Sequence, residues 1–372
     1  MKILHTESSL GWGGQEIRVL TEARGVARRG HTVAIAAPRE ARIFAEAPAY
    51  GVEIIGLSIA RKGLAGVGAV KRLLAERPFD IVNTHSSTDS WLVTLAGAWA
   101  RHVPAIVRTR HISSPVPRNF ASRWLYARAD RIVTTGERLR LQVIEETGAD
   151  PARTVSIPTG IDLGRFRPGD RAAARAGLGL PADASIVGIV ATLRSWKGHL
   201  HLLEAVASLA RPGIRLVVVG DGPMREALVA RTAELGLAGR VTFAGNQREV
   251  APWMQSFDLF CLPSYANEGV PQALAQAMAC GLAVVTTPVG SISELVDDGR
   301  TGLIVPPAQP ALLAQAIAAL LDDPARRISL GDAALAEART RLGEDAMVDA
   351  MIRVFSEALA CSSPPRSSAH SG

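Results

Sequence analysis

Short apolar runs alternate with longer amphipathic stretches along most of the chain. Apolar residues recur at a helical spacing in the intervals, for example over residues 15–29 and 66–76. This alternation is typical of βαβ units and a parallel sheet. In the first half we expect strands at residues 2–5, 32–36, 54–57, 81–84, 105–108, 131–134 and 155–158.

A Pro- and Gly-rich passage over residues 157–170 interrupts this pattern, which then starts again. The later apolar runs cover residues 185–190, 215–219, 240–243, 259–262, 283–286 and 302–305. We therefore predict two Rossmann-like, doubly wound α/β domains, residues 1–168 and 169–344, that face each other across a cleft. A helix over residues 345–360 is expected to pack back on the first domain. The polar tail 361–372 is expected to be disordered.

Composition agrees with two folded domains. The chain has 372 residues, of which 48% are hydrophobic, and this excludes overall disorder. Its 3 cysteines are too few for a disulfide framework, which favours a reducing compartment. No secretory signal pattern opens the sequence and no apolar stretch reaches membrane-spanning length, so we expect a cytoplasmic protein.

The net charge is distributed unevenly. Residues 1–170 contain 24 Lys and Arg against 16 Asp and Glu, whereas the remainder contains 17 against 19. The basic excess therefore belongs to the first half. An anionic partner, such as a membrane surface, a lipid phosphate or nucleic acid, would explain it, and so would solubility alone.

The richest chemical signal follows the apolar run at residues 259–262. Glu268 ends a loop, Gly269 permits close backbone approach, and Pro271 suits the first turn of a helix. Free amides at such a helix start, beyond the carboxyl end of a strand, favour phosphate. Gln276 is expected two helical turns further along. Alternatively, Glu268 only caps the helix and Gln276 faces solvent.

In its wider context this segment resembles the retaining GT-B glycosyltransferases of glycosyltransferase family four. Their pattern E-G-x-P-x-x-x-x-E-A-M-A-x-G-x-P-V-V matches from Glu268, except that Gln276 replaces the second Glu and Ala283 the later Pro. The resemblance implies that Glu268 lies by the donor sugar and that Gln276 contacts the nucleotide ribose. It also implies that the amides of Gly269, Val270 and Pro271 hold the donor diphosphate.

Other signatures of this family follow in order. They are Ile157-Pro-Thr-Gly-Ile-Asp162, Val219-Gly-Asp-Gly-Pro223, the run from Asp258 to Ser264, and the run from Val289 to Gly302. By resemblance, Gly220 and Gly222 belong to the nucleotide-binding domain. Gly13 and Gly14 resemble an N-terminal glycine loop near the diphosphate and the acceptor, although a tight strand-to-helix turn would need the same residues.

The family uses an Arg and a Lys in G-R-L-x-x-x-K-G to bind the donor phosphates. Lys197 keeps its place in the corresponding segment, whereas Thr192 stands at the Arg position. We expect Arg194, two residues later, to take over that role. Two cations beside a diphosphate stabilise the charge that develops on the leaving group.

Two histidines follow strand-like runs of the first domain. By resemblance, His111 lies close to the reacting sugar and His85 ends a neighbouring strand, although either can be purely structural. Glu137 follows another run and is expected to touch donor or acceptor. No Asp-x-Asp, His-Glu-x-x-His or cysteine cluster occurs, so we expect neither a metal site nor a cofactor apart from the donor.

The resemblance implies a metal-independent enzyme that transfers a sugar with retention of configuration. The donor would be a UDP- or GDP-linked sugar, and the acceptor a glycan or lipid-linked molecule of polysaccharide, lipopolysaccharide or glycolipid synthesis. Nucleic acid is not expected as a partner. A non-hydrolysing sugar-nucleotide epimerase and a homologue that binds the donor without transfer remain alternatives.

Two basic stretches account for much of the charge asymmetry. Residues 61–77 predict an amphipathic helix, and residues 117–131 combine arginines with Phe120, Trp124 and Tyr126. Such segments can lie on an anionic membrane, here the inner face of the cytoplasmic membrane. The alternative is that their apolar faces pack against the sheet while the cations stay solvated.

Overall fold

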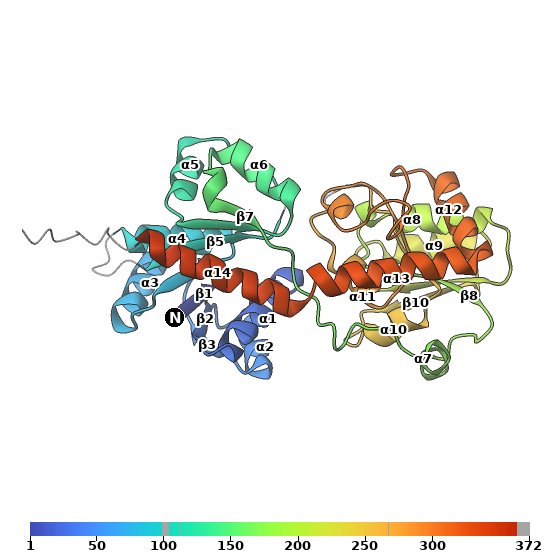
Figure 1. Cartoon of the computed structure of the whole chain (residues 1–372), viewed down its shortest axis with the longest axis horizontal. Coiled ribbons are helices and arrows are strands. Elements are labelled where there is room, and N and C mark those ends of the chain that lie inside the picture. Colours follow the sequence, from blue (N-terminus) through green and yellow to red (C-terminus); the bar gives the residue numbers. More distant parts are fainter. Residues whose placement is uncertain (99–103, 113, 267, 363–372) are drawn as a thin grey trace, which may run out of the picture. The chain divides into compact units, whose positions relative to one another are not determined.

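The chain folds into two compact α/β units. The computed structural model describes residues 1–98, 104–112, 114–266 and 268–362. One unit contains residues 1–160 together with the C-terminal segment from Glu344, and the other contains residues 161–343. Each unit holds one parallel sheet with its own helices (Figure 1). The expected fold class of two doubly wound domains is confirmed.

The first unit contains a seven-stranded sheet in the order β3-β2-β1-β4-β5-β6-β7. Its strands are β1 (Lys2–Thr6), β2 (Thr32–Ala37), β3 (Glu53–Gly56), β4 (Ile81–Thr84), β5 (Ala105–Arg110), β6 (Arg131–Thr134) and β7 (Thr154–Ser156). Its helices are α1 (Gly14–Arg28), α2 (Arg42–Glu46), α3 (Leu64–Glu76), α4 (Ser87–Gly97), α5 (Phe120–Ala127), α6 (Glu137–Thr147) and α14 (Glu344–Ser362), with 3₁₀ turns η1 (Ala47–Tyr50) and η2 (Pro151–Arg153).

The second unit contains a six-stranded sheet in the order β10-β9-β8-β11-β12-β13. Its strands are β8 (Ser185–Val190), β9 (Ile214–Val219), β10 (Val241–Gly245), β11 (Leu259–Leu262), β12 (Val284–Thr286) and β13 (Leu303–Ile304). Its helices are α7 (Arg171–Leu178), α8 (His199–Ser208), α9 (Arg225–Glu234), α10 (Ala251–Ser256), α11 (Gln272–Ala279), α12 (Pro310–Asp322) and α13 (Pro324–Arg341), with 3₁₀ turns η3 (Ser195–Lys197) and η4 (Ile292–Glu294).

Successive residues of a central strand pack into different hydrophobic cores, one on each face of the sheet. In β1, Ile3 packs in a core with residues of α1 and α14, whereas Leu4 packs in a core with residues of α3 and α4. This follows from the two-residue period of a strand between two layers of helices. Both faces of the first sheet are therefore buried, and apolar residues fill both kinds of position.

The C-terminal helix α14 belongs to the first unit, where it packs beside α1. Met351 and Phe355 are fully buried there, and Arg29 pairs with Asp349 at 2.6 Å. The helix includes residues 361 and 362, which we expected in a disordered tail. Residues 363–372 of that tail lie outside the described part of the chain.

The boundary between the units differs from the expected residue 168. The amide of Ile161 donates to the carbonyl of Leu342 at 2.7 Å, and Phe166 lies in the core of the second unit. Residues 161–168 thus belong to the second unit. Proline and glycine content marked the connection, but the hydrogen bonds that assign it to one side are not visible in composition.

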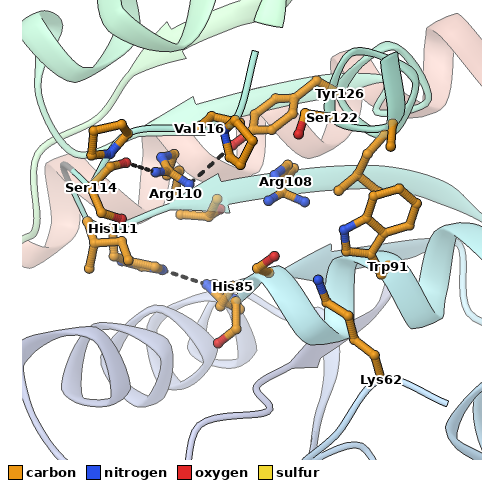
Figure 2. Close-up of a pocket in the computed structure, with 18 of the residues that line it drawn as sticks. Lys62, His85, Trp91, Arg108, Arg110, His111, Ser114, Val116, Ser122 and Tyr126 are labelled. Atoms are coloured by element: carbon orange, nitrogen blue, oxygen red, sulfur yellow. Dashed lines mark hydrogen bonds between the residues drawn. The ribbon is translucent and has the colours of Figure 1, made fainter. Parts of the chain in front are cut away.

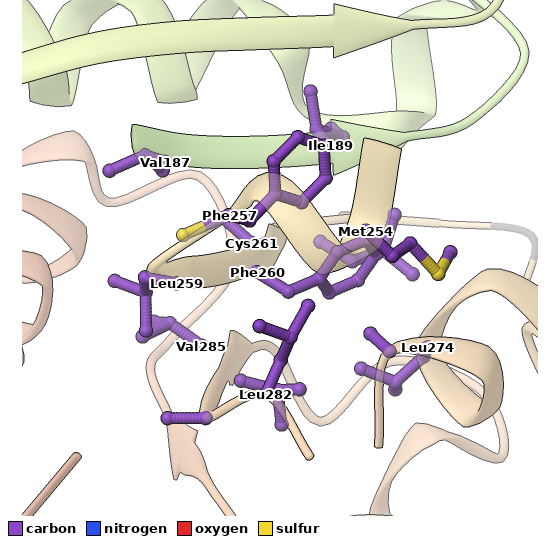
Figure 3. Close-up of a cluster of buried hydrophobic side chains, with 14 of the residues drawn as sticks. Val187, Ile189, Met254, Phe257, Leu259, Phe260, Cys261, Leu274, Leu282 and Val285 are labelled. Carbon is purple, nitrogen blue, oxygen red and sulfur yellow. The ribbon is translucent and has the colours of Figure 1, made fainter. Parts of the chain in front are cut away.

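The core of the second unit surrounds β11 (Figure 3). All four residues of β11 are buried, because helices cover both faces of this central strand. Phe257 lies so close to β8 that a Cβ atom at Gly188 would be 2.1 Å from its ring. Close packing of this kind makes loss of a large side chain costly.

In each sheet there is one pair of neighbouring strands whose following connections lead to opposite faces of the sheet. The pair is β1 and β4 in the first unit, and β8 and β11 in the second. Such a switch point opens a crevice at the carboxyl ends of the two strands. It is the place in each unit where loop residues can meet a ligand.

We expect Phe260→Ala to lower the free energy of unfolding of the second unit by about 3–5 kcal/mol, because Phe260 is fully buried. Urea unfolding measures this change. The matched variant Phe120→Ala removes a ring that is 83% exposed and should change stability by less than about 0.5 kcal/mol. Equal effects of the two substitutions would contradict the packing described.

Candidate functional site

An ion pair spans the switch point of the second unit. Lys197 follows β8 in the turn η3, and Glu268 lies in the loop between β11 and α11. The Lys197 Nζ donates to Glu268 Oε1 and Oε2 at 2.6 and 2.9 Å, and the Ser264 hydroxyl donates to Oε1 at 2.5 Å. Glu268 is only 6% exposed. Two residues that the sequence predicted for donor binding are thus brought together, and they hold each other.

Close backbone contacts fix the loops that carry this pair. At Gly198 (φ 78°), a Cβ atom would lie 2.0 Å from the carbonyl oxygen of Pro263. At Gly290 (φ 63°), it would lie 2.0 Å from the carbonyl oxygen of Glu268. Only glycine tolerates both the positive φ and the short approach. These two glycines therefore set where Lys197 and Glu268 lie.

The turn with Gly220 and Gly222 supports the loop after β8. The Leu193 amide donates to the Asp221 carbonyl and the Met224 amide to the Leu193 carbonyl, both at 3.0 Å. This loop leads into Arg194, which is exposed and whose guanidinium carbon lies 5.7 Å from the Trp196 ring centroid.

The start of α11 differs in detail from the prediction. Pro271 is the N-cap and the helix begins at Gln272. Proline has no N–H, so it cannot offer an amide to a phosphate, and only the Gly269 and Val270 amides remain of the three that we expected. Glu268 precedes the helix, so the half-buried Gln276 lies little more than one turn into α11, not two.

Three histidines form a chain at the switch point of the first unit, with His5 and His85 buried and His111 half-buried. His5 lies in β1, and His85 and His111 follow β4 and β5. His5 Nδ1 lies 2.9 Å from His85 Nε2, and His85 Nδ1 lies 2.9 Å from His111 Nε2. The structure thus links the two predicted histidines through hydrogen bonding and adds a third.

Burial keeps this chain uncharged. It lowers the pKa of His5 to about 3 and holds the pKa values of His85 and His111 well below the usual value, with the neighbouring histidines and Arg18 adding to the effect at His85. At neutral pH the three rings therefore exchange hydrogen bonds as neutral imidazoles.

Buried carboxyl groups surround the chain. Asp89 accepts bonds from the His85 and Ser86 amides and from the Thr6 hydroxyl, yet burial and the charge of Glu7 raise its pKa to about 7. Burial likewise raises the pKa of Glu22 to about 7, although Arg18 opposes the shift. These groups change charge near neutral pH.

Two further predictions for the first unit fall on helix starts. Gly13 is the N-cap of α1 and Gly14 its first residue, as a strand-to-helix turn requires. Glu137 is the first residue of α6, where Arg140 binds its carboxylate at 2.7 Å. That ion pair lowers the pKa of Glu137.

A pocket of about 430 Å³ opens beside His85 and His111. It lies among α4, β5, α5 and the loop after β5 (Figure 2). Trp91 and Tyr126 provide aromatic walls, and Lys62, Arg108 and Arg110 also line it. The whole pocket belongs to the first unit.

Within the described residues, no group of three or more His, Cys, Asp or Glu side chains could hold a metal ion. The described helices also include none that is long and apolar enough to cross a membrane.

Known families match both units. The model described as "Glycosyltransferase Family 4" matches residues 12–165, and the one described as "Glycosyl transferases group 1" matches residues 184–323. A D-inositol 3-phosphate glycosyltransferase of Mycobacterium tuberculosis is 32% identical over 83% of this chain and 71% of its own length. The chain belongs to glycosyltransferase family 4.

One more relative and one solved structure are similar to this family 4 protein, the structure as a likeness of fold. A D-inositol 3-phosphate glycosyltransferase of Nocardia farcinica is 35% identical over 70% of this chain, a match that spans only 62% of that relative. A crystal structure of Anabaena HepE in complex with UDP-glucose has a TM-score of 0.82 at 23% identity. It covers 96% of this chain and 99% of that one.

Three side chains of this family 4 protein were not predicted as site residues. His5 lies inside β1, in a run that we predicted only as a strand. Arg108 and Arg110 are the fourth and sixth residues of β5, where charged residues are rare in a strand with helices on both faces. Two arginines at alternate positions at the end of a buried strand were the signal that could have identified the pocket.

The His5 ring of this family 4 protein should stay neutral at pH values far below the usual pKa of histidine. We expect its NMR resonance not to titrate between about pH 8 and pH 5. The unfolded chain does take up that proton, so His5 removes stability as pH falls from about 6.5 towards 3. His5→Gln assigns the resonance, and a midpoint near pH 6.5 would contradict the buried neutral chain.

Proposed function

We propose that this chain is a metal-independent, retaining glycosyltransferase that moves a sugar from a nucleotide-diphosphate sugar to a glycan or lipid-linked acceptor. The observation that carries the proposal is the ion pair between the half-buried Lys197 and the buried Glu268 at the switch point of the second unit. Membership in family 4 supports it, and so does the likeness to HepE, whose structure contains UDP-glucose.

The reaction replaces one bond to the sugar by another. The bond between the anomeric carbon and the diphosphate oxygen breaks, and the nucleoside diphosphate leaves with the electron pair. The acceptor hydroxyl oxygen forms the new bond and its proton is released. Charge therefore grows on the diphosphate in the transition state, where fixed cations and amides lower the barrier.

The candidate donor-binding groups of the second unit have different roles in this proposal. Glu268 accepts hydrogen bonds from hydroxyl groups of the donor sugar, while Lys197 and Arg194 face the diphosphate together with the Gly269 and Val270 amides. Lys197 is bonded to Glu268 in the structure, so donor phosphate would share its Nζ, which has three donor hydrogens.

The first unit would hold the acceptor in its pocket, with His111 near the reacting sugar. Since the pKa of His111 is far below its usual value, this ring offers hydrogen bonds and not a positive charge. The basic groups available to an acceptor are instead Lys62, Arg108 and Arg110.

Two departures from the family pattern concern the donor. Gln276 can accept a hydrogen bond from a ribose hydroxyl through its amide oxygen, but it lacks the charge of a glutamate. Thr192 is exposed and cannot replace an arginine, which leaves Arg194 as the second cation. Weaker or altered donor binding follows, and a homologue that binds without transfer is the corresponding alternative.

Glu268→Gln keeps the shape of the side chain but removes its charge. We expect sugar transfer to fall by about 100-fold or more, equivalent to roughly 3 kcal/mol of transition-state stabilisation. Release of nucleoside diphosphate from UDP- and GDP-sugars, with and without oligosaccharide or lipid-linked acceptors, measures this loss. The matched control is Glu234→Gln, which changes an exposed carboxylate of the same unit.

The same assay separates the alternatives. A transferase yields a product heavier by one sugar, and NMR of its anomeric proton reports whether configuration is retained. An epimerase yields a new sugar nucleotide of unchanged mass. Donor binding without release would favour the inactive homologue, and inhibition by EDTA would refute metal independence.

We further propose that the first unit contacts an anionic membrane. Leu64 at the start of α3 is 88% exposed and Phe120 at the start of α5 is 83% exposed, and basic residues such as Arg61 and Arg118 lie beside them in sequence. The other large apolar residues of α3, such as Val70, are buried, so contact would involve helix starts and not a whole helix face.

Phe120→Ser should weaken binding to vesicles that contain anionic lipid by about tenfold, because one exposed ring no longer enters the interface. Co-sedimentation measures this binding, which should also decrease with salt. Ile328→Ser removes an exposed apolar residue of the second unit and serves as control. Equal binding to neutral vesicles would contradict the proposal.

A further inference from the structure

The pocket of the first unit contains a buried arginine, Arg108, whose hydrogen-bonding capacity is only partly used by the described residues. Arg108 is 5% exposed, and its Nε and Nη1 atoms have no hydrogen-bond partner among the described residues. Its guanidinium carbon lies 4.3 Å from the centre of the Tyr126 ring, a cation–π contact that offsets part of the cost of burial. An arginine stays charged, so the unused N–H groups remain costly until an acceptor reaches them.

A second arginine lies on the same face of the strand. Arg110 donates to the Ser114 carbonyl and, at 3.3 Å, to the Tyr126 hydroxyl, while its Nε is also without a partner. Both side chains line the pocket, as residues two apart in a strand must share a side. The two hydrogen bonds of Arg110 hold it in place and use two of its five N–H groups, so the Nε–H is still available to a ligand.

The other lining residues add a cation and no anion. The Lys62 Nζ lies 5.6 Å from the Trp91 ring centroid, and both residues line the pocket. Figure 2 shows Lys62 and Arg108 with their nitrogen atoms towards the same space beside Trp91. None of the described lining residues is an Asp or Glu.

The carboxyl groups nearest the pocket are hydrogen-bonded to other groups. Asp89 acts on Arg108 at longer range, since its oxygens accept bonds from Thr6 and from the His85 and Ser86 amides. Glu7 accepts bonds from the side chains of Gln15 and Ser86, and Glu146 accepts one from the Val116 amide. Two guanidinium groups and an ammonium group thus face a cavity whose described lining includes no Asp or Glu.

We propose that this pocket binds an oxyanion, a phosphate or carboxylate group, attached to the acceptor sugar. The planar guanidinium of Arg108 offers N–H groups in the geometry that such anions accept, and Arg110 and Lys62 add charge. Trp91 offers a flat apolar face to the ring that carries the anion. The assignment rests on the proposed function, because it names the class of acceptor that the first unit would hold.

Direct binding tests this assignment without any transfer. Calorimetry on the full chain would compare glucose 6-phosphate and glucuronate with glucose, and would include inorganic phosphate. We expect the anionic sugars to bind at least about tenfold more tightly than glucose. Preference for the phosphate over the carboxylate, or the reverse, identifies the kind of anion.

Arg108→Gln should reduce binding of the anionic sugars by about 10- to 100-fold and leave binding of glucose unchanged, as expected when charge-assisted hydrogen bonds are lost. Arg108→Lys should restore part of the affinity. Lys62→Gln, at an exposed position, should cause a smaller loss and does not endanger folding. Arg153→Gln removes an exposed cation of the same unit and should have no effect.

Equal binding of glucose and its anionic counterparts, or a preference that survives Arg108→Gln in the folded protein, would overturn the assignment. So would absence of phosphate binding at millimolar concentration. Arginine-dependent anion binding in a protein that never releases nucleotide from a sugar donor would support the pocket chemistry and refute the transferase proposal.

Discussion

The main constraint on this protein is the parallel order of its two sheets. In each unit one neighbouring pair of strands sends its connections to opposite faces, so the loops diverge and leave a crevice. His5 is the last but one residue of β1, His85 and His111 follow β4 and β5, and Lys197 and Glu268 follow β8 and β11. Polar and charged side chains therefore gather at one edge of each sheet, while apolar residues fill the rest of the strands.

The charged side chains at the carboxyl edges of the two sheets differ in whether they have hydrogen-bond partners. In the second unit, Lys197 and Glu268 neutralise each other and Ser264 completes the carboxylate, so a ligand must share bonds that already exist. In the first unit, Arg108 contacts the Tyr126 ring, but two of its nitrogen atoms have no hydrogen-bond acceptor among the described residues. A ligand would supply that acceptor. A buried charge without a partner costs more than a paired one.

Much of the fold could be predicted from sequence because buried parallel strands are short apolar runs, and each expected run overlaps a strand of the structure. Candidate site residues could be placed from sequence where they follow a strand, as at Glu268, His85 and His111, while their roles stay predictions. Such residues were missed where polar residues replace apolar ones inside a strand, as at His5 and Arg108. Residues 161–168 group with the second unit and not, as expected, with the first, because Ile161 bonds to Leu342 and Phe166 enters the core of the second unit, and neither contact is visible in composition. Periodicity gives elements, but it does not give the register that brings particular side chains together.

Burial also explains which side chains of the first unit are neutral and which stay charged. The three histidines remain uncharged because desolvation penalises imidazolium, and the neighbouring carboxyl groups Asp89 and Glu22 titrate near pH 7 for the same reason. Guanidinium groups keep their charge under the same penalty, since arginine is not deprotonated in proteins. Among the described residues that line the pocket, those with a fixed positive charge are therefore the two arginines, which stay charged even when buried, and a more exposed lysine. They are Arg108, Arg110 and Lys62. The basic excess of the first half of the sequence thus has an interior component as well as a surface one, and the interior component is the part that salt would screen least.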